Sequence, residues 1–307
     1  MDKVYDLIIV GSGPAGLSAG IYAQRAELDT LIIEKYGMSG GQIINTYEVD
    51  NYPGIPGISG YDLAVKFREH CDKLGAIFID GDVTHFEVDN EIKKIILDNK
   101  SEYLAKTIII ATGAKWRKLN VPGEDKFQGL GVSYCATCDG AFFKNRITTV
   151  VGGGDVAVED AIFLARLCEK VYVVHRRDEF RAAKSLSSKL MNTENVEIIW
   201  DSVVEQIIGE NVVEKVKIKN VKTGEEREVL TDGVFIAVGT MPSTDVYKEY
   251  LDCDQAGYII AGENCETNIP GVYAAGDIRT KELKQIITAA ADGANAITAV
   301  EKYLNTH

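Results

Sequence analysis

Short apolar runs dominate the hydrophobic pattern of this chain and predict buried strands. Val4–Val10 and Thr30–Ile33 are two such runs near the N-terminus, and Thr148–Val151 and Val171–Val174 are two more in the middle of the chain. A stretch of helical composition separates the members of each pair, Leu17–Arg25 in the first case. Strands that alternate with helices in this way are typical of βαβ units and a parallel sheet.

Two longer stretches alternate apolar and polar residues and predict antiparallel strands. Ile77–Ile110 is expected to form a small antiparallel meander inserted between parallel strands, and Asn195–Leu230 is expected to repeat this plan. Three further helices are predicted: Asp62–Leu74, a helix from the second glycine-rich loop to about Cys168, and one from about Gln285 to Leu304.

The plan of strands, helix and insertion therefore occurs twice along the chain. Each copy closes with an apolar strand that ends on a glycine, Ile108–Gly113 and Gly233–Gly239. A last strand, ending at Asp277, most simply completes the first sheet. We expect the α/β class, with two Rossmann-like, three-layer ββα dinucleotide-binding domains, the second inserted into a discontinuous first. The expected boundaries are 1–114 and 243–307 for the first domain and 115–242 for the second.

The first glycine-rich loop has the spacing of a dinucleotide-binding turn. Gly11, Gly13 and Gly16 form a G-x-G-x-x-G pattern between a strand and a helix. Gly11 permits the tight turn, Gly13 lets a pyrophosphate approach the backbone, and Gly16 lets the helix pack close to the strand. The free N–H groups of the helix N-terminus then face the diphosphate. Glu34, at the end of the next strand, can accept hydrogen bonds from both hydroxyls of an adenosine ribose.

The second glycine-rich loop, Gly152–Ala157, has the G-x-G-x-x-A form and a different residue type at the ribose position. The run His175-Arg176-Arg177 stands where the first unit has Glu34, and Arg181 follows one turn later. A carboxylate would repel a 2′-phosphate, whereas a guanidinium pairs with it through two hydrogen bonds. The first site therefore suits an unphosphorylated ribose and the second suits NADP. The alternative is that the basic run is a solvated helix entrance without a ligand.

Charge and composition narrow the classes of function. The net charge of −13 argues against a nucleic-acid surface and against docking on anionic lipid. The apolar run near the N-terminus contains several glycines and follows Asp2 and Asp6 rather than basic residues. Neither a signal peptide nor a membrane span is expected, and a cytoplasmic location is predicted.

The six cysteines divide into one close pair and four isolated residues. Cys135 and Cys138 form a C-x-x-C motif, which can close a redox disulfide, bind half of a zinc site, or have no chemical role. A zinc site needs two further ligands, and none of the four histidines pairs with a second C-x-x-C, so no metal is expected. The isolated cysteines are expected to be small buried apolar residues: Cys71, Cys168, Cys253 and Cys265.

Over essentially its whole length, the chain resembles the bacterial-type, low-molecular-weight thioredoxin reductases. The motifs that carry the resemblance are, in order, GSGPAG, GGQ, DNYPG, ATG, CATCDG, GGGDVA, HRR and AAGD. CATCDG directly before a G-x-G-x-x-A loop is the specific part, because many disulfide reductases share the flavin motifs. The resemblance implies FAD and NADPH as cofactors, thioredoxin as the protein substrate and a homodimer. From the charge and composition, no nucleic-acid or membrane partner is expected.

The resemblance also implies roles for individual residues. Cys138 faces the flavin, Cys135 attacks thioredoxin, and Asp139 is the acid and base of the exchange. The residues implied for FAD are Gly11, Ser12, Gly13, Pro14, Ala15, Gly16, Glu34, Lys35, Gly40, Gly41, Gln42, Asn51, Val83, Ala111, Thr112, Gly113, Gly276, Asp277, Lys284, Gln285, Ile286 and Ala289. Those implied for NADPH are Gly152, Gly153, Gly154, Asp155, Val156, Ala157, His175, Arg176, Arg177, Arg181, Val238 and Gly239.

Two positions of this chain depart from the pattern of the family that it resembles. The family usually has serine or threonine at Val156 and arginine at Lys284. Because the cysteine pair belongs to the NADPH module, the pair and the nicotinamide compete for one flavin. The resemblance implies a rotation of that module about linkers near 114–117 and 241–245, which would gate turnover.

Three other functions compete with this interpretation. A reductase of the same kind could serve a glutaredoxin-like protein or a peroxiredoxin system instead of thioredoxin. A ferredoxin–NADP-type flavoprotein reductase would lack the cysteine pair. A flavin-binding redox sensor would keep the fold without steady turnover.

Overall fold

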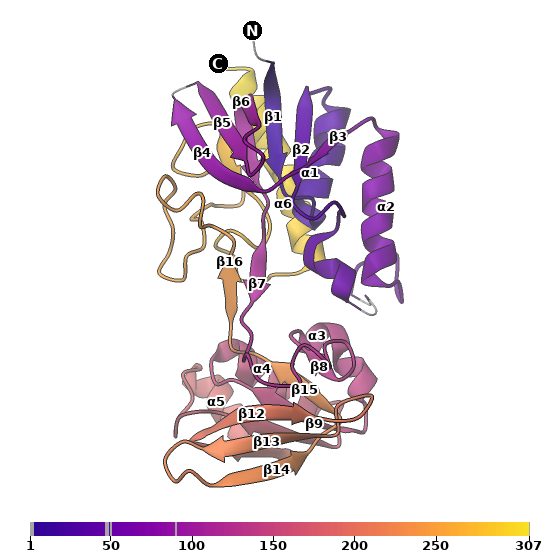
Figure 1. The fold of residues 1–307 in the computed structure, drawn as a ribbon, viewed down its shortest axis with the longest axis vertical. Coiled ribbons are helices and arrows are strands. Elements are labelled where there is room, and N and C mark those ends of the chain that lie inside the picture. Colours follow the sequence, from indigo (N-terminus) through magenta and orange to yellow (C-terminus); the bar gives the residue numbers. More distant parts are fainter. Residues whose placement is uncertain (1–2, 47–48, 50, 90, 307) are drawn as a thin grey trace. The chain divides into compact units, whose positions relative to one another are not determined.

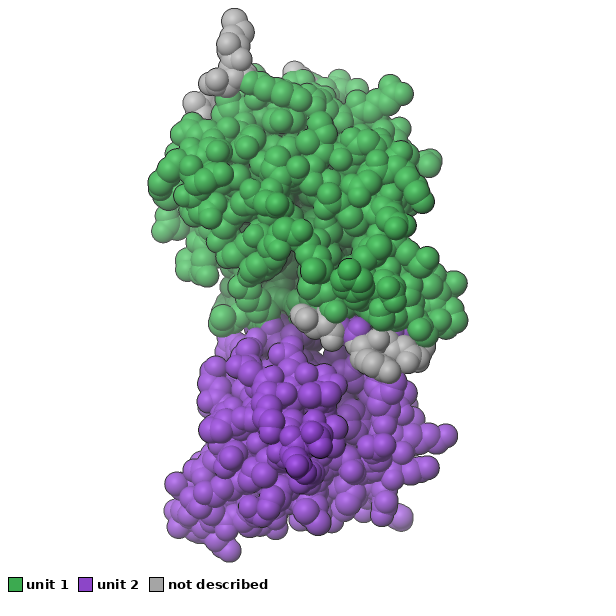
Figure 2. All heavy atoms as spheres, turned by 45° about the vertical axis from the view of Figure 1, so that its right-hand side comes forward, with its two compact units in different colours: residues 1–45, 52–115, 241–307 green, residues 46–51, 116–240 purple. Residues whose placement is uncertain are grey.

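The computed structural model describes residues 3–46, 49, 51–89 and 91–306 (Figure 1). The chain divides into two compact units, coloured separately in Figure 2. Unit 1 combines residues 1–45, 52–115 and 241–307, and unit 2 combines residues 46–51 and 116–240. The chain passes between the units at β7 (Ala114–Trp116) and β16 (Thr240–Pro242), which pair as a two-stranded sheet. The predicted linkers overlap these two strands.

Unit 1 is built on a seven-stranded sheet with the order β3-β2-β1-β6-β5-β4, and β17 pairs with β6. Its elements are β1 (Val4–Val10), α1 (Pro14–Arg25), β2 (Thr30–Glu34), the 3-10 helix η1 (Gly41–Asn45), α2 (Gly60–Lys73), β3 (Ile77–Asp80), β4 (Val83–Asp89), β5 (Ile92–Leu97), β6 (Glu102–Ile110), β17 (Val272–Ala274) and α6 (Ile286–Leu304).

Both faces of this sheet are covered, which explains why β1 is apolar at consecutive positions. Leu7 and Ile9 lie in one apolar cluster with α1 and α6, while Ile8 and Val10 lie in a second cluster with β4 and β5. Successive side chains of a strand point to opposite faces. A parallel strand buried on both sides therefore shows a continuous apolar run.

The predicted meander at 77–110 is only partly right. β3 pairs in parallel with β2 and forms an edge of the parallel part of the sheet, so it is not an antiparallel strand. β4, β5 and β6 do pair antiparallel in succession. β6 also pairs in parallel with β1, and its length lets one strand serve both arrangements.

Unit 2 contains a five-stranded parallel sheet with the order β11-β10-β9-β15-β8 and a separate antiparallel sheet, β12-β13-β14. Its elements are β8 (Val132–Ser133), α3 (Ala136–Asp139), the 3-10 helix η2 (Gly140–Phe143), β9 (Ile147–Val151), α4 (Asp155–Ala165), β10 (Lys170–Val174), α5 (Lys184–Met191), β11 (Val196–Ile199), β12 (Ser202–Ile208), β13 (Lys215–Asn220), β14 (Glu226–Leu230) and β15 (Gly233–Ile236).

The parallel sheet of unit 2 lies between helices and the antiparallel sheet. Val150 and Val173 pack in a cluster with residues of α4, whereas Val151 and Val174 pack with residues of β12, β13 and β14. This alternation produces the three layers expected of a ββα domain. The first strand of the predicted 195–230 insertion, β11, joins the parallel sheet instead of the antiparallel one.

Two helix ends differ from the prediction, for local reasons. α1 begins at Pro14, because proline has no N–H to lose at the first helical position. α4 ends at Ala165 rather than at Cys168. The side-chain amide of Asn195 donates to the carbonyls of Ala165 and Cys168, at 2.9 and 3.0 Å, and so replaces a further helical turn.

The isolated cysteines largely meet their expectation. Cys71, Cys168 and Cys265 are buried, and Cys253 is half-buried. Burial raises the pKa of the Cys71 and Cys265 thiols to about 12, so neither is a ready nucleophile. Among the described helices, none is long and apolar enough to span a bilayer.

Candidate functional site

The cysteine motif of unit 2 forms a disulfide. Cys135 and Cys138 are bonded, with their Cα atoms 5.3 Å apart. Cys135 precedes the one-turn helix α3, and its N–H donates to the Ser133 hydroxyl at 3.1 Å. The same hydroxyl donates to the Asp139 carboxylate at 2.6 Å. Ser133, which the sequence did not single out, therefore joins the disulfide to the predicted acid.

The surroundings of the Asp139 carboxyl raise its pKa. Within the described chain, its Oδ1 is buried and has no hydrogen-bond partner, while Oδ2 accepts the bond from Ser133. Burial raises the pKa of this carboxyl, and the bond from Ser133 opposes that shift. A carboxyl with a raised pKa next to a thiol pair suits general acid and base chemistry.

Replacing Asp139 with asparagine is expected to slow the thiol–disulfide exchange of the pair about a hundredfold. As an acid, Asp139 acts in its protonated form, so the rate of the parent should fall as the pH rises through its raised pKa. The variant should lose that descending limb in a stopped-flow pH profile. Ser133→Ala removes the bond that lowers the pKa and should move the limb to higher pH. An unchanged profile in Asp139→Asn would remove Asp139 from the chemistry.

The first glycine-rich loop has the close backbone contacts that its glycines predict. Gly11 has a φ of +102°, and a Cβ there would lie 2.5 Å from the carbonyl oxygen of Ala111. A Cβ on Gly16 would lie 1.9 Å from the Gly11 carbonyl oxygen, whereas one on Gly13 would meet nothing within 4 Å. Gly13 therefore leaves open space at the N-terminus of α1, as an approaching diphosphate requires.

Glu34 closes this loop from the end of β2. Its buried carboxylate accepts a hydrogen bond from the Ser12 N–H at 3.0 Å, another from the Ser12 hydroxyl, and one from the Tyr36 N–H at 2.9 Å. The Gly40 N–H donates to the Ser12 carbonyl at 2.7 Å, and a Cβ on Gly41 would lie 3.3 Å from the Gly13 Cα. The structure thus brings these predicted residues together.

The positions of four other residues predicted for the first site do not by themselves assign them a role in binding a nucleotide. Lys35 forms an exposed ion pair with Asp82 at 2.6 Å, and Gln42 is exposed. Val83 is buried at the start of β4. Asn51 is exposed and falls in the short stretch 46–51 that is grouped with unit 2. The roles of these four residues stay predictions.

The turn at Gly276-Asp277 lies against the first glycine loop and presents a buried acceptor. A Cβ on Gly276 would lie 2.9 Å from the Cβ of Ala15 and 3.7 Å from that of Ala289. In the described part of the chain, Oδ1 of Asp277 is buried without a hydrogen-bond partner. Burial raises the pKa of Asp277, and Lys281 and then Lys284 oppose this. An orphaned buried acceptor fits a ligand hydroxyl that donates to it.

The helix that follows this turn starts with a reciprocal cap. Gln285 is the N-cap of α6, and its side chain and that of Thr288 each bond the other's backbone. The amine of Lys284 lies 3.0 Å from the ring centroid of Tyr258. Lys284 therefore makes a cation–π contact within unit 1.

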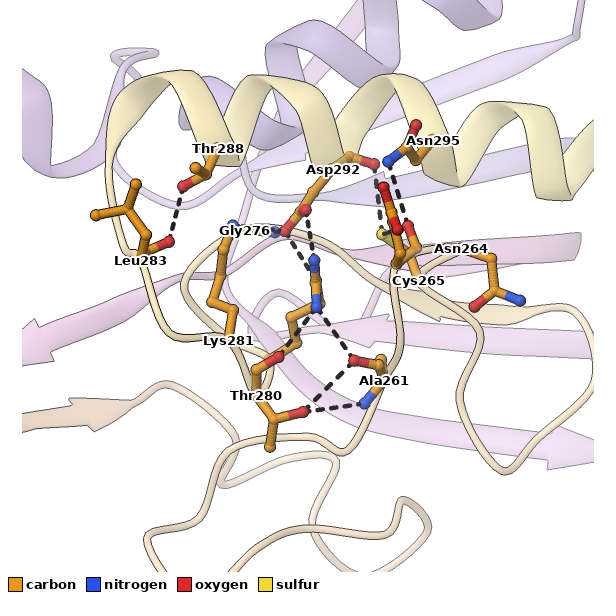
Figure 3. Close-up of polar contacts among 12 residues, drawn as sticks. Ala261, Asn264, Cys265, Gly276, Thr280, Lys281, Leu283, Thr288, Asp292 and Asn295 are labelled. Atoms are coloured by element: carbon orange, nitrogen blue, oxygen red, sulfur yellow. Dashed lines mark hydrogen bonds and ion pairs between the residues drawn. The ribbon is translucent and has the colours of Figure 1, made fainter. Parts of the chain in front are cut away.

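A buried ion network around Asp292 supports the same turn. Asp292 lies on α6 and points toward Gly276 and Lys281 in Figure 3. Its carboxylate accepts bonds from the Gly276 N–H at 2.8 Å and from Lys281 Nζ at 2.9 Å. Arg279 donates to both oxygens, from Nε at 2.8 Å and from Nη2 at 2.6 Å. The sequence held one signal for this network, since Asp292 is the only charged residue between 286 and 300.

Asp292→Asn is expected to lower the free energy of unfolding by about 3 kcal/mol, because it leaves the buried Arg279 without a full counter-charge. Glu301→Gln makes the same chemical change at an exposed position of α6 and should change it by less than about 0.5 kcal/mol. Urea unfolding of both variants checks this. Equal midpoints for Asp292→Asn and the parent would mean that the network does not hold the turn.

The second glycine-rich loop repeats the geometry of the first. Gly152 has a φ of +154°, and a Cβ there would lie 2.4 Å from the carbonyl oxygen of Ala237. This matches the first loop, where a Cβ on Gly11 would lie 2.5 Å from the carbonyl oxygen of Ala111. Gly154 leaves open space at the N-terminus of α4. Val156 is 58% exposed beside it. Both loops therefore offer a free helix N-terminus.

The basic run after β10 divides into a buried and an exposed part. Arg176, Arg177 and Arg181 are exposed, and among the described residues none of their guanidinium groups has an acidic partner. His175 is buried, and a Cβ on Gly153 would lie 2.2 Å from its Nδ1. Burial lowers the pKa of His175, so this residue supports the loop as a neutral ring instead of adding charge.

The remaining residues predicted for the second site make contacts within unit 2, and their roles toward the nucleotide stay predictions. Oδ1 of Asp155 accepts a hydrogen bond from the Ala183 N–H at 2.8 Å and so ties α4 to the segment after the arginines. Gly239 has a φ of +101°, and its carbonyl accepts a bond from the Arg117 N–H at 2.9 Å. Val238 packs at the edge of the apolar cluster beneath β15.

Two nucleotide-type loops and a C-x-x-C disulfide in one chain are features of flavin-dependent disulfide reductases. A model of the pyridine nucleotide-disulphide oxidoreductases matches residues 5–293. The chain belongs to this family. It is therefore an oxidoreductase enzyme, and the resemblance found in the sequence is confirmed.

Individual relatives agree with this assignment. The chain is 46% identical over 314 residues to a thioredoxin reductase of Peptoclostridium acidaminophilum, covering 100% of this chain and 99% of the relative. It is 45% identical over 304 residues to one of Bacillus subtilis, covering 99% and 96%. The crystal structure of a thioredoxin reductase from Streptococcus pyogenes matches with a TM-score of 0.93 and 47% identity, over 100% of both chains. The α/β class and the two-domain dinucleotide-binding fold are thereby confirmed.

Proposed function

We propose that this oxidoreductase reduces the disulfide of thioredoxin with electrons from NADPH, through FAD and the Cys135–Cys138 disulfide. The observation that carries the proposal is the disulfide itself, bonded next to a buried carboxyl and in the same unit as the second glycine-rich loop. The relatives named above, which match along the full chain, support thioredoxin as the substrate.

The cofactor assignment follows the chemistry of the two loops. Unit 1 has a carboxylate, Glu34, at the ribose position and an orphaned acceptor, Asp277, which suit FAD. Unit 2 has exposed arginines at the equivalent position, which suit the 2′-phosphate of NADPH. We accordingly assign residues 1–114 and 243–307 to FAD and residues 115–242 to NADPH. The homodimer and the cytoplasmic location stay predictions.

When bound, FAD supplies the electron transfer between the nicotinamide and the disulfide. The chain's own residues do the rest. Arg177 and Arg181 hold the 2′-phosphate, and the open backbone at Gly154 takes the diphosphate. In unit 1, the open backbone at Gly13 would hold the FAD diphosphate, and Asp277 would accept a hydrogen bond from a hydroxyl of the ribityl chain. No step of the thiol chemistry requires a metal ligand set, and the described residues contain no cluster that could hold a metal.

Reduction of thioredoxin then proceeds by two thiol–disulfide exchanges. The Cys135 thiolate attacks one sulfur of the thioredoxin disulfide, which forms a mixed disulfide and releases a thioredoxin thiolate. Asp139 delivers a proton to that thiolate. The Cys138 thiolate next attacks Cys135 Sγ, which restores the disulfide and releases the second thioredoxin thiolate, to be protonated from solvent. Two electrons leave the cysteine pair and enter thioredoxin.

An NADPH-driven assay with the chromogenic disulfide DTNB, with and without thioredoxin, tests this function. We expect steady turnover that requires NADPH and rises with thioredoxin concentration. A reductase for a glutaredoxin-like or peroxiredoxin partner would turn over only with that partner. A redox sensor would bind FAD and show no steady turnover, and this result would overturn the proposal.

A further inference from the structure

Glu124 is a buried carboxylate in unit 2 that belongs to neither nucleotide site. It is 2% exposed and accepts three hydrogen bonds. Two come from backbone N–H groups, Leu119 at 3.0 Å and Asn120 at 2.7 Å, and the third comes from the Tyr134 hydroxyl at 2.7 Å. The first two donors lie on the segment by which the chain enters unit 2. The third lies directly before Cys135.

A second contact joins the same two segments. The ring of Trp116, at the end of β7, stacks on the ring of Tyr134 with centroids 6.3 Å apart and an interplanar angle of 16°. Residues 116–120 are therefore fixed to Tyr134 at two points, one aromatic and one polar. A charged acceptor makes hydrogen bonds about twice as strong as neutral ones, so the Glu124 contacts are the firmer link.

Tyr134 is also linked to the redox pair through Ser133 and Cys135, its neighbours in sequence. The Ser133 hydroxyl accepts a hydrogen bond from the Cys135 N–H and donates one to the Asp139 carboxylate. The residue before Tyr134 is therefore bonded to the predicted acid, and the residue after it is a cysteine of the redox pair. With the disulfide closed, residues 133–139 are joined to one another by hydrogen bonds and by the disulfide. Glu124 contacts this segment near its start, at Tyr134.

We propose that Glu124 is a positioning residue for the Cys135–Cys138 pair: by holding Tyr134 against residues 116–120, it fixes the place from which Cys135 Sγ attacks a disulfide. The reaction that it serves is the exchange proposed above, and in this respect the inference rests on the proposed function. Glu124 is not one of the reacting groups of either exchange. Its effect passes through the Tyr134 backbone, and a displacement of a nucleophile by about 1 Å can cost a hundredfold in rate.

The neighbouring carboxylate provides a matched control. Asp125 pairs with Lys118 at 2.6 Å, and its side chain is 77% exposed. Asp125→Asn removes the same charge one residue away without touching Tyr134. Glu124→Gln keeps the size of the side chain but places an amide N–H₂ where one of the backbone donors needs an acceptor. Tyr134→Phe removes only the hydroxyl from the other end of the contact.

The test uses the full-length holoenzyme with Trp200→Phe, which leaves Trp116 as the only tryptophan. The pair is reduced with dithiothreitol and reoxidised with DTNB, so neither NADPH nor thioredoxin is needed. We expect Glu124→Gln and Tyr134→Phe each to slow reoxidation about tenfold, the double variant to be no slower than the slower single variant, and Asp125→Asn to stay within twofold. The fluorescence emission of Trp116 should change when the cysteine pair is reduced in the parent and in Asp125→Asn. It should not change in Glu124→Gln or in Tyr134→Phe.

Several outcomes would overturn the proposal. Folded Glu124→Gln and Tyr134→Phe with the parent's rate and the parent's emission change would leave Glu124 a purely structural residue, even if their melting temperatures fell. Losses that multiply in the double variant would show that the two residues act independently. If Glu124→Gln does not fold, Tyr134→Phe decides alone. Failure of the NADPH and thioredoxin assay would not affect this result, because the chemical reductant and DTNB bypass both.

Discussion

Cys138→Ser is expected to lower NADPH-dependent reduction of thioredoxin by at least about a thousandfold. Serine cannot displace the second thioredoxin sulfur, so a reduced Cys135 that attacks thioredoxin should remain in a mixed disulfide. A covalent complex should therefore accumulate and be visible on a non-reducing gel. Reduction of the bound flavin by NADPH should survive, because that step precedes the cysteine chemistry.

The free cysteines supply the control for this variant. Cys253→Ser removes a half-buried thiol from unit 1 and should keep turnover within about twofold of the parent, as expected for a substitution away from the reacting groups. If Cys135→Ser traps thioredoxin and Cys138→Ser does not, the roles of the two cysteines are exchanged. If Cys138→Ser turns over normally, the pair is not the relay.

Arg177→Gln combined with Arg181→Gln should lower kcat/KM for NADPH by about a hundredfold to a thousandfold and leave kcat/KM for NADH nearly unchanged. Each charge-assisted hydrogen bond to the 2′-phosphate contributes about 1.5–3 kcal/mol, and NADH has no such phosphate. Steady-state kinetics with both nucleotides measure the change in preference. The exposed Arg166→Gln is the matched control, since it removes a guanidinium from the same unit outside the run.

The arginine assignment has a clear contrary result. Equal losses with NADPH and NADH in the double variant would mean that the arginines support the fold of the loop and do not select the phosphate. Equal kcat/KM values for the two nucleotides in the parent would mean that the second site does not distinguish them. Either result would leave the cysteine chemistry intact and would change only the assignment of the electron donor.

The glycine-rich loops could be predicted because their geometry is local. A turn from a strand into a helix needs a positive φ and room for a neighbouring strand's carbonyl, and Gly11 and Gly152 meet both needs. The sequence also predicted the two strands that supply these carbonyls, at Ala111 and Ala237. The order of motifs along the chain was sufficient for this part of the fold.

Long-range pairing and burial could not be predicted in the same way. Asp292 is only one carboxylate in an apolar helix until the fold brings Arg279, Lys281 and the Gly276 N–H to it. His175 and Arg176 are the first and second residues after β10, yet the histidine is buried against Gly153 and the arginine is exposed. Alternation alone does not give the direction of strand pairing, which is why β3 was expected to be antiparallel.

The measurement that bears most directly on the proposed electron path is the stoichiometry of a single anaerobic reaction. Oxidised thioredoxin in excess over the enzyme is mixed with limiting NADPH, and the NADPH absorbance and the free thiols of thioredoxin are followed together. We predict one thioredoxin disulfide reduced for each NADPH oxidised, whereas in Cys138→Ser both changes should stop at about one equivalent per enzyme, because the flavin is reduced once and Cys135 stays in the mixed disulfide. NADPH loss without new thiols, or thiols that appear at the same rate in Cys138→Ser, would contradict the path through Cys135 and Cys138.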